Sequence, residues 1–164
     1  MKRLLFLVIT AFLSACVAIP TPIPTPTTGI PVTLLVEENP YRPQPEDASF
    51  RPAGVVLTNT SLLDRFDLDP FRVELNLSGS LPSVCNELRV EVAPPNLNYQ
   101  VFVEVYSMVN PKINCDNVFQ QFEASILLGV YSTGRYTVWV NENLVGDFIT
   151  YQRNFLDNFI VKKK

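Results

Sequence analysis

Apolar and polar residues alternate along seven short segments between residues 55 and 149, and this pattern leaves few folds open. Successive side chains of an extended strand point to opposite faces, so period-two alternation predicts half-buried β-strands. Residues that favour turns (Gly, Pro, Asn and Ser) separate the segments, which lie at 55–57, 71–77, 88–92, 99–106, 118–128, 136–140 and 144–149. Seven strands with one apolar face each predict an all-β fold, a seven-stranded antiparallel sandwich of two sheets.

The sixth predicted strand carries a motif of its own. Residues 134–141 read Gly-Arg-Tyr-Thr-Val-Trp-Val-Asn, which resembles the G-x-Y-x-V-x-V-N segment of immunoglobulin-like and fibronectin-III-like domains. The resemblance implies a tyrosine corner, in which the hydroxyl of Tyr136 reaches back to the upstream backbone. Such domains often have a cysteine two residues later. This chain has Val138 there, so the antibody-type disulfide is not expected.

The first sixteen residues have the layout of an export signal. Lys2 and Arg3 precede an apolar run at 4–13, which is too short for a bilayer that takes about 20 residues to cross. The run ends in Leu13-Ser14-Ala15-Cys16 and so resembles the lipobox of bacterial lipoproteins. The resemblance implies that Cys16 receives a diacylglyceryl group and becomes the mature N-terminus. The alternatives are an ordinary signal peptide with an incidental cysteine, or a buried core helix.

A lipidated Cys16 would attach the chain to a lipid bilayer. Each buried methylene contributes about 0.8 kcal/mol to membrane retention, so two or more acyl chains anchor stably. The expected location is the extracytoplasmic side of the cell membrane, or the outer membrane if the cell is diderm.

Proline dominates the residues that follow. Nine of the fourteen prolines lie between Pro20 and Pro52, and proline fixes φ and removes a backbone donor, which disfavours both helix and central strand. Residues 16–52 are therefore expected to be an extended tether, although 32–36 could pair as a strand. The predicted sandwich covers 53–150, and 151–164 form a tail that is either a short helix or an extra strand.

The cysteine count agrees with export. With Cys16 lipidated, Cys85 and Cys115 remain, and an exported cysteine pair is normally oxidised. The expected bridge is structural, because the chain has no C-x-x-C spacing.

The order of segments from 55 to 148 is similar to that of uncharacterised exported lipoproteins of environmental bacteria. The matching segments are Leu81-Pro82-Ser83-Val84-Cys85, Leu88-Arg89-Val90, Val103-Glu104-Val105-Tyr106-Ser107, Cys115, Phe122-Glu123-Ala124, Leu128-Gly129-Val130-Tyr131 and Tyr136-Thr137-Val138-Trp139-Val140-Asn141. This resemblance supports the cysteine pair and the fold, and it implies no activity. Where such proteins turn through Asn-Gly, this chain has Asn141-Glu142, which favours a longer or bulged loop over a strict two-residue turn.

Composition removes several classes of function. The chain has 13 basic and 16 acidic residues, so it lacks the basic field that a nucleic-acid partner requires. It has no histidine, which excludes Ser-His-Asp and Cys-His catalysis and every His-ligated metal site. Neither an enzymatic activity nor a cofactor or metal is expected.

Two acidic groups have plain explanations. Asp64, Asp67 and Asp69 lie close together, but the spacing lacks the glycine turn and final acid of a calcium loop, so a solvated loop is expected. Glu91 and Glu104 could face each other across two strands, where an exposed pair is more common than an acid–base couple in a cleft.

Aromatic residues supply the candidate contact face. Phe102 and Tyr106 lie opposite the valine face of their strand, and Trp139 lies opposite Tyr136 and Val138. If the two strands are neighbours, Phe102, Tyr106 and Trp139 form an aromatic patch that suits a glycan, a peptide or an envelope protein. The alternative is that the tether or the tail covers them. The leading hypothesis is a non-enzymatic binding or interaction module of the bacterial envelope, and the alternatives are a structural spacer or an enzyme inhibitor.

Overall fold

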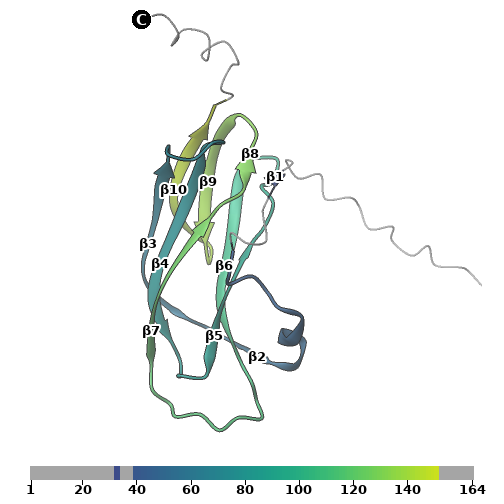
Figure 1. Cartoon of the computed structure of the whole chain (residues 1–164), viewed down its shortest axis with the longest axis vertical. Coiled ribbons are helices and arrows are strands. Elements are labelled where there is room, and N and C mark those ends of the chain that lie inside the picture. The colour runs from purple at the N-terminus through teal and green to yellow at the C-terminus, as the bar shows by residue number, and fades with distance from the viewer. Residues whose placement is uncertain (1–31, 34–38, 152–164) are drawn as a thin grey trace, which may run out of the picture.

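The computed structural model describes residues 32–33 and 39–151. The lipobox, most of the predicted tether and residues 152–164 of the predicted tail lie outside these ranges. Two sheets face each other across a shared core (Figure 1). Among the residues described, no helix has the length and hydrophobicity to cross a bilayer.

One sheet has three strands and is antiparallel throughout. Its order is β3 (Val56–Arg65), β4 (Arg72–Leu81) and β7 (Gln120–Leu127). Val73, Leu75 and Leu77 of β4 are at most 2% exposed, as expected for the alternating positions that face the core.

The second sheet is built around β6 (Gln100–Val109). On one side β6 pairs with β5 (Asn86–Val92). On its other side it pairs first with β9 (Gly134–Val140), which continues to β10 (Asn143–Thr150), and then with β2 (Arg51–Ala53). A separate two-stranded pairing joins β1 (Val32–Thr33) to β8 (Val130–Tyr131).

The predicted all-β sandwich is confirmed. The seven predicted segments correspond to β3, β4, β5, β6, β7, β9 and β10. The core lies between the sheets and consists of apolar residues that the alternation had assigned to one face, among them Leu75, Val90, Val101, Val103, Ile126, Tyr136, Val138 and Val140.

The prediction of an antiparallel sandwich is wrong at one contact, since β6 and β9 run parallel. The strand β7 and the two-residue β8 lie between β6 and β9 along the chain, and the chain enters β9 at the end of the sheet where β6 begins, so both run in the same direction. In an immunoglobulin sandwich, the strand that pairs with the equivalent of β9, in the place that β6 takes here, is the first strand after the chain crosses from one sheet to the other. Here that strand is β5, and it lies one position further out. Alternation specifies which face a side chain takes, but not the direction of the neighbouring strand.

The predicted boundary at residue 53 is also wrong, because the residues before it pack on the second sheet. Asn39 is 3% exposed, and its side-chain amide donates to the carbonyl of Val90 at 2.9 Å. The amide of Val90 donates in turn to the carbonyl of Tyr41 at 2.7 Å. These contacts cover the outer edge of β5. The 3-10 helix η2 (Pro45–Ser49) and β2 follow.

The segment 39–53 can contain several prolines because it runs along a sheet edge, where a missing backbone N–H donor destabilises the sheet little. The alternative strand at 32–36 is present in part, as β1.

The β9–β10 turn is tighter than expected. Val140 pairs directly with Asn143, so the loop contains only Asn141 and Glu142. Their φ angles are 45° and 68°, the left-handed pair that a two-residue type I′ turn requires. The longer or bulged loop predicted from the Asn-Glu sequence is therefore wrong, although a bulge follows within β10, between Leu144 and Gly146.

The disulfide prediction is confirmed. Cys85 and Cys115 are bonded, with their Cα atoms 6.0 Å apart. The bond joins the loop before β5 to the loop before β7. Both loops lie at the end of the molecule remote from the β9 start (Figure 1).

Candidate functional site

The predicted aromatic residues lie on the outer face of the second sheet. Val101, Val103 and Val105 of β6 are no more than 3% exposed and point into the core. The residues between them therefore point outward. Phe102 is 39% exposed, and Tyr106 is half-buried on the same face.

The parallel pairing of β6 with β9 brings two of the three predicted aromatics together. Phe102 is the register partner of Trp139, and their ring centroids are 6.3 Å apart with 31° between the planes. Tyr106 lies four residues further along β6, about 13 Å at the usual strand rise. The three side chains therefore do not form one continuous stack.

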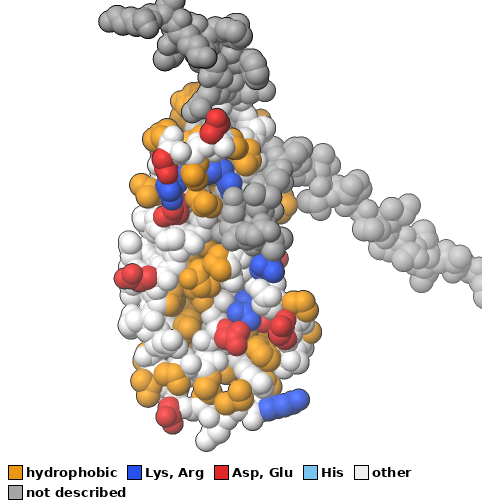
Figure 2. Space-filling view, in the orientation of Figure 1, with side chains coloured by type: hydrophobic (Ala, Val, Ile, Leu, Met, Phe, Trp, Pro, Cys, Tyr) orange, Lys and Arg blue, Asp and Glu red, His pale blue; other side chains and the backbone are white. Residues whose placement is uncertain are grey.

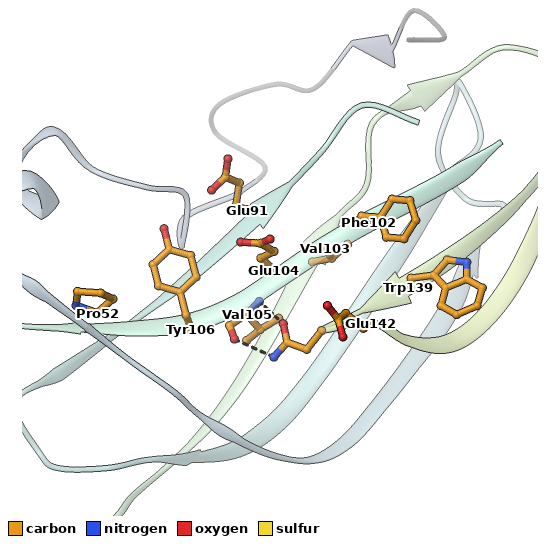
Figure 3. Close-up of a pocket in the computed structure, with 10 residues that line it drawn as sticks. Pro52, Glu91, Phe102, Val103, Glu104, Val105, Tyr106, Trp139 and Glu142 are labelled. Carbon is orange, nitrogen blue, oxygen red and sulfur yellow. Dashed lines mark hydrogen bonds between the residues drawn. The ribbon is translucent and has the colours of Figure 1, made fainter. Parts of the chain in front are cut away.

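All three aromatics line a single open groove of about 700 Å³. Phe102 and Trp139 lie toward one end of it, and Tyr106 and Pro52 toward the other (Figure 3). A groove of this size with aromatic side chains at both ends has the dimensions of a site for a small or extended ligand.

Carboxylates line the middle of the groove. Glu91 of β5 and Glu104 of β6 are direct register partners, and Glu142 is contributed by the β9–β10 turn. Within 32–33 and 39–151, none of the three takes part in an ion pair. Like charges directly opposite each other destabilise a sheet, so the pairing of Glu91 with Glu104 lowers the stability of the second sheet.

The surroundings of Tyr106 in the groove raise the pKa of its phenol. Its partial removal from water raises the pKa of the phenol, and the negative charge of Glu91 raises it further. The phenol therefore stays neutral at physiological pH and can donate a hydrogen bond to a ligand.

Sequence reasoning did not identify Asn141, which lines the same groove. Its Oδ1 accepts from the amide of Val105 at 2.8 Å, and its Nδ2 donates to the carbonyl of Val105 at 2.9 Å. The dashed lines of Figure 3 mark both bonds. The side chain thus takes the place of a paired strand between the end of β9 and β2. The signal available in the sequence was an Asn directly after a strand, a residue type that tolerates positive φ.

Tyr136 has the contacts that the resemblance implied. The side chain is fully buried, and its hydroxyl donates to the carbonyl of Ser132 at 3.0 Å, four residues upstream. Its ring stacks on Phe148 and meets Tyr99 edge-on. These contacts hold the start of β9 against the core, remote from the groove's carboxylates.

The acidic loop at 64–69 has a local ion pair. Arg65 contacts Asp67 at 2.8 Å and Glu74 at 2.5 Å. The hydrogen bond from Arg65 lowers the pKa of Asp67. Among the described residues, no set of three or more His, Cys, Asp or Glu side chains is arranged to hold a metal ion.

Comparison with known protein families gives one match. The model of the ORF11 beta-sandwich domain matches residues 75–150. The matched range begins within β4 and ends with β10, so it contains the disulfide, Tyr136 and every groove residue except Pro52. Searches of curated proteins and of solved structures give no match.

Proposed function

We propose that the protein is a lipid-anchored, extracytoplasmic binding module of the bacterial cell envelope, without catalytic activity, and that the groove on β6 is its contact surface. The observation that carries the proposal is the neighbouring pair of exposed Phe102 and half-buried Trp139, whose tilted rings lie together in an open groove. Aromatic side chains in such a position favour a contact surface, because they offer a large apolar area to a ligand.

Two features support the location. The lipobox Leu13-Ser14-Ala15-Cys16 and the preceding basic and apolar runs are typical of lipoprotein export. The bond between Cys85 and Cys115 fits an oxidising compartment, because cytosolic thiols are normally kept reduced. The absence of histidine supports a role without catalysis.

The anchor is tested by intact-mass analysis of the protein extracted from membranes. We expect a chain that begins at Cys16, carries a diacylglyceryl group and has no free thiol. A Cys16→Ser variant is expected to lose the lipid mass. An uncleaved chain in the cytosol with three free thiols would refute the proposal.

The contact surface is tested with the mature chain that begins at residue 16 and carries Cys16→Ser, because this chain lacks both the lipid and the apolar run at 4–13. Its binding to isolated envelope fragments therefore depends on residues 16–164. Trp139→Ala is expected to reduce the bound fraction about tenfold or more, with an unchanged thermal unfolding midpoint. Phe119→Ala is the matched control, because Phe119 is 68% exposed in the loop before β7. Unchanged binding, or unfolding of the Trp139→Ala chain, would instead support a covered, structural face.

A further inference from the structure

Building on the proposed function, we infer that the groove binds an extended polypeptide segment in which a lysine or arginine has apolar residues two positions before and after it. The proposal follows from the order of side chains along β6. Phe102, Glu104 and Tyr106 are alternate residues of one strand, so they present an apolar, an acidic and an apolar position in a row.

The spacing of these positions matches an extended peptide. Alternate residues of a strand lie about 6.6–7 Å apart on one face, and the same holds for alternate residues of an extended ligand. A peptide that runs along β6 therefore places its residues i, i+2 and i+4 over Phe102, Glu104 and Tyr106 in either direction. Trp139 widens the apolar position at Phe102, and Pro52 widens the one at Tyr106.

The negative charge around Glu104, the central of the three positions, favours a positively charged side chain in the bound peptide. Glu91, Glu104 and Glu142 all line the groove. Arg89 lies beside Tyr106 in register, but it is bound to Asp47 and Glu87. A groove with one sign of charge attracts the opposite sign, and aromatic walls strengthen that attraction for a cation.

The hydroxyls of a neutral glycan can donate hydrogen bonds to these carboxylates, but only a cation also neutralises their charge. The groove is open along its length, so the backbone of a bound peptide stays in contact with water, and its amides need no partners in the protein.

The experiment measures binding of two nine-residue peptides to the mature full-length chain in detergent. One peptide is Gly-Thr-Leu-Thr-Lys-Thr-Leu-Thr-Gly, capped at both ends, and the other has norleucine in place of the lysine. We expect the lysine peptide to bind about tenfold more tightly, and its affinity to fall as salt is raised.

Glu104→Gln separates a binding role from a structural one. It is expected to weaken the lysine peptide about tenfold and to leave the norleucine peptide unchanged. The unfolding midpoint should not fall, since the change removes the repulsion between Glu91 and Glu104. Glu123→Gln, an exposed carboxylate on the other sheet, is the matched control and should change neither affinity.

Three results would overturn the inference. The first is equal or absent binding of the two peptides, and the second is an unchanged affinity after Glu104→Gln. The third is tighter peptide binding after Lys162→Gln, Lys163→Gln and Lys164→Gln together, because the occupant would then be the chain's own tail. If the peptides fail while Trp139→Ala still abolishes envelope binding, the ligand class is wrong and the proposed function stands. If Trp139→Ala also leaves envelope binding intact, both fall.

Discussion

At the scale of single residues, Asn141 has the largest consequence for the structure around the groove. β9 pairs with β6 as far as Val103 and β2 pairs with β6 only from Ser107. Val105 lies between these two pairings and is 3% exposed. The amide of Asn141 supplies both partners for its backbone. One side chain thus maintains the hydrogen bonding of β6 at Val105 on the side opposite β5, where no strand is adjacent.

Asn141→Gly tests this role, because glycine keeps the positive φ of the turn and removes only the side chain. The amide and carbonyl of Val105 lose their protein partners, so the free energy of unfolding should fall by about 1–3 kcal/mol. Urea unfolding followed by tryptophan fluorescence measures the change.

The matched control is Glu142→Gly in the same turn. Glu142 adopts a φ of 68°, so glycine there should raise the free energy of unfolding by about 1 kcal/mol. Equal effects of the two glycine variants would show that the contacts of Asn141 contribute nothing.

At the scale of elements, the segment from Asn39 to Ala53 is held to the second sheet by polar contacts. Arg89 of β5 is 8% exposed at its side chain and contacts Asp47 of η2 at 2.8 Å. Further along, the hydroxyl of Ser107 donates to the carbonyl of Ala53 at 3.1 Å. The segment therefore belongs to the folded domain, although its composition is that of a tether.

Asp47→Asn is expected to weaken this attachment in a pH-dependent way. The hydrogen bond from Arg89 lowers the pKa of Asp47 below the ordinary aspartate value of about 3.9. A lowered folded-state pKa means that the pair stabilises the fold above pH 4, and that this stability is lost as the pH falls through the folded-state pKa. The variant should be less stable than the parent by about 1–3 kcal/mol at pH 6.5, and the difference should shrink toward pH 2.5.

Urea unfolding at both pH values measures the effect. Glu46→Gln is the control, because Glu46 is an exposed neighbour in η2 that forms no ion pair within the described residues. A stability difference for Asp47→Asn that is independent of pH would contradict the assignment.

The elements also show what could be predicted from the sequence. Strands such as β4 and β6 have one buried face each, so alternation located them and correctly put Phe102 and Trp139 on outer faces. The contacts of Asn39 and Asp47 involve single polar side chains, which leave no periodic pattern. The direction of β9 relative to β6 depends on the path of the chain between them, and the pairing of Glu91 with Glu104 depends on strand register. Both are properties of the assembled sheet.

At the scale of the whole molecule, the disulfide holds together the two places where the chain changes sheet at one end. The loop before β5 leads from the three-stranded sheet to the second, and the loop before β7 leads back. Both loops expose apolar side chains, seen at the lower end in Figure 2, and Val84, Ile113, Val118 and Phe119 are each at least 52% exposed. Loops so weakly buried contribute little packing of their own, so the bond should carry much of their order.

Reduction of this bond should therefore lower the stability of both sheets together. Cys85 and Cys115 are 30 residues apart in sequence, and closing a loop of that length corresponds to about 3–4 kcal/mol in the chain-entropy account. We expect Cys85→Ser with Cys115→Ser, in the Cys16→Ser chain, to lower the urea midpoint in a single cooperative transition. Dithiothreitol should have the same effect on the Cys16→Ser chain and none on the variant that lacks all three cysteines. Because the groove is formed by β6 and β9 and not by these loops, envelope binding should survive wherever the reduced protein remains folded. A transition that splits in two would show that the sheets unfold separately, and that the bond acts on the loops alone.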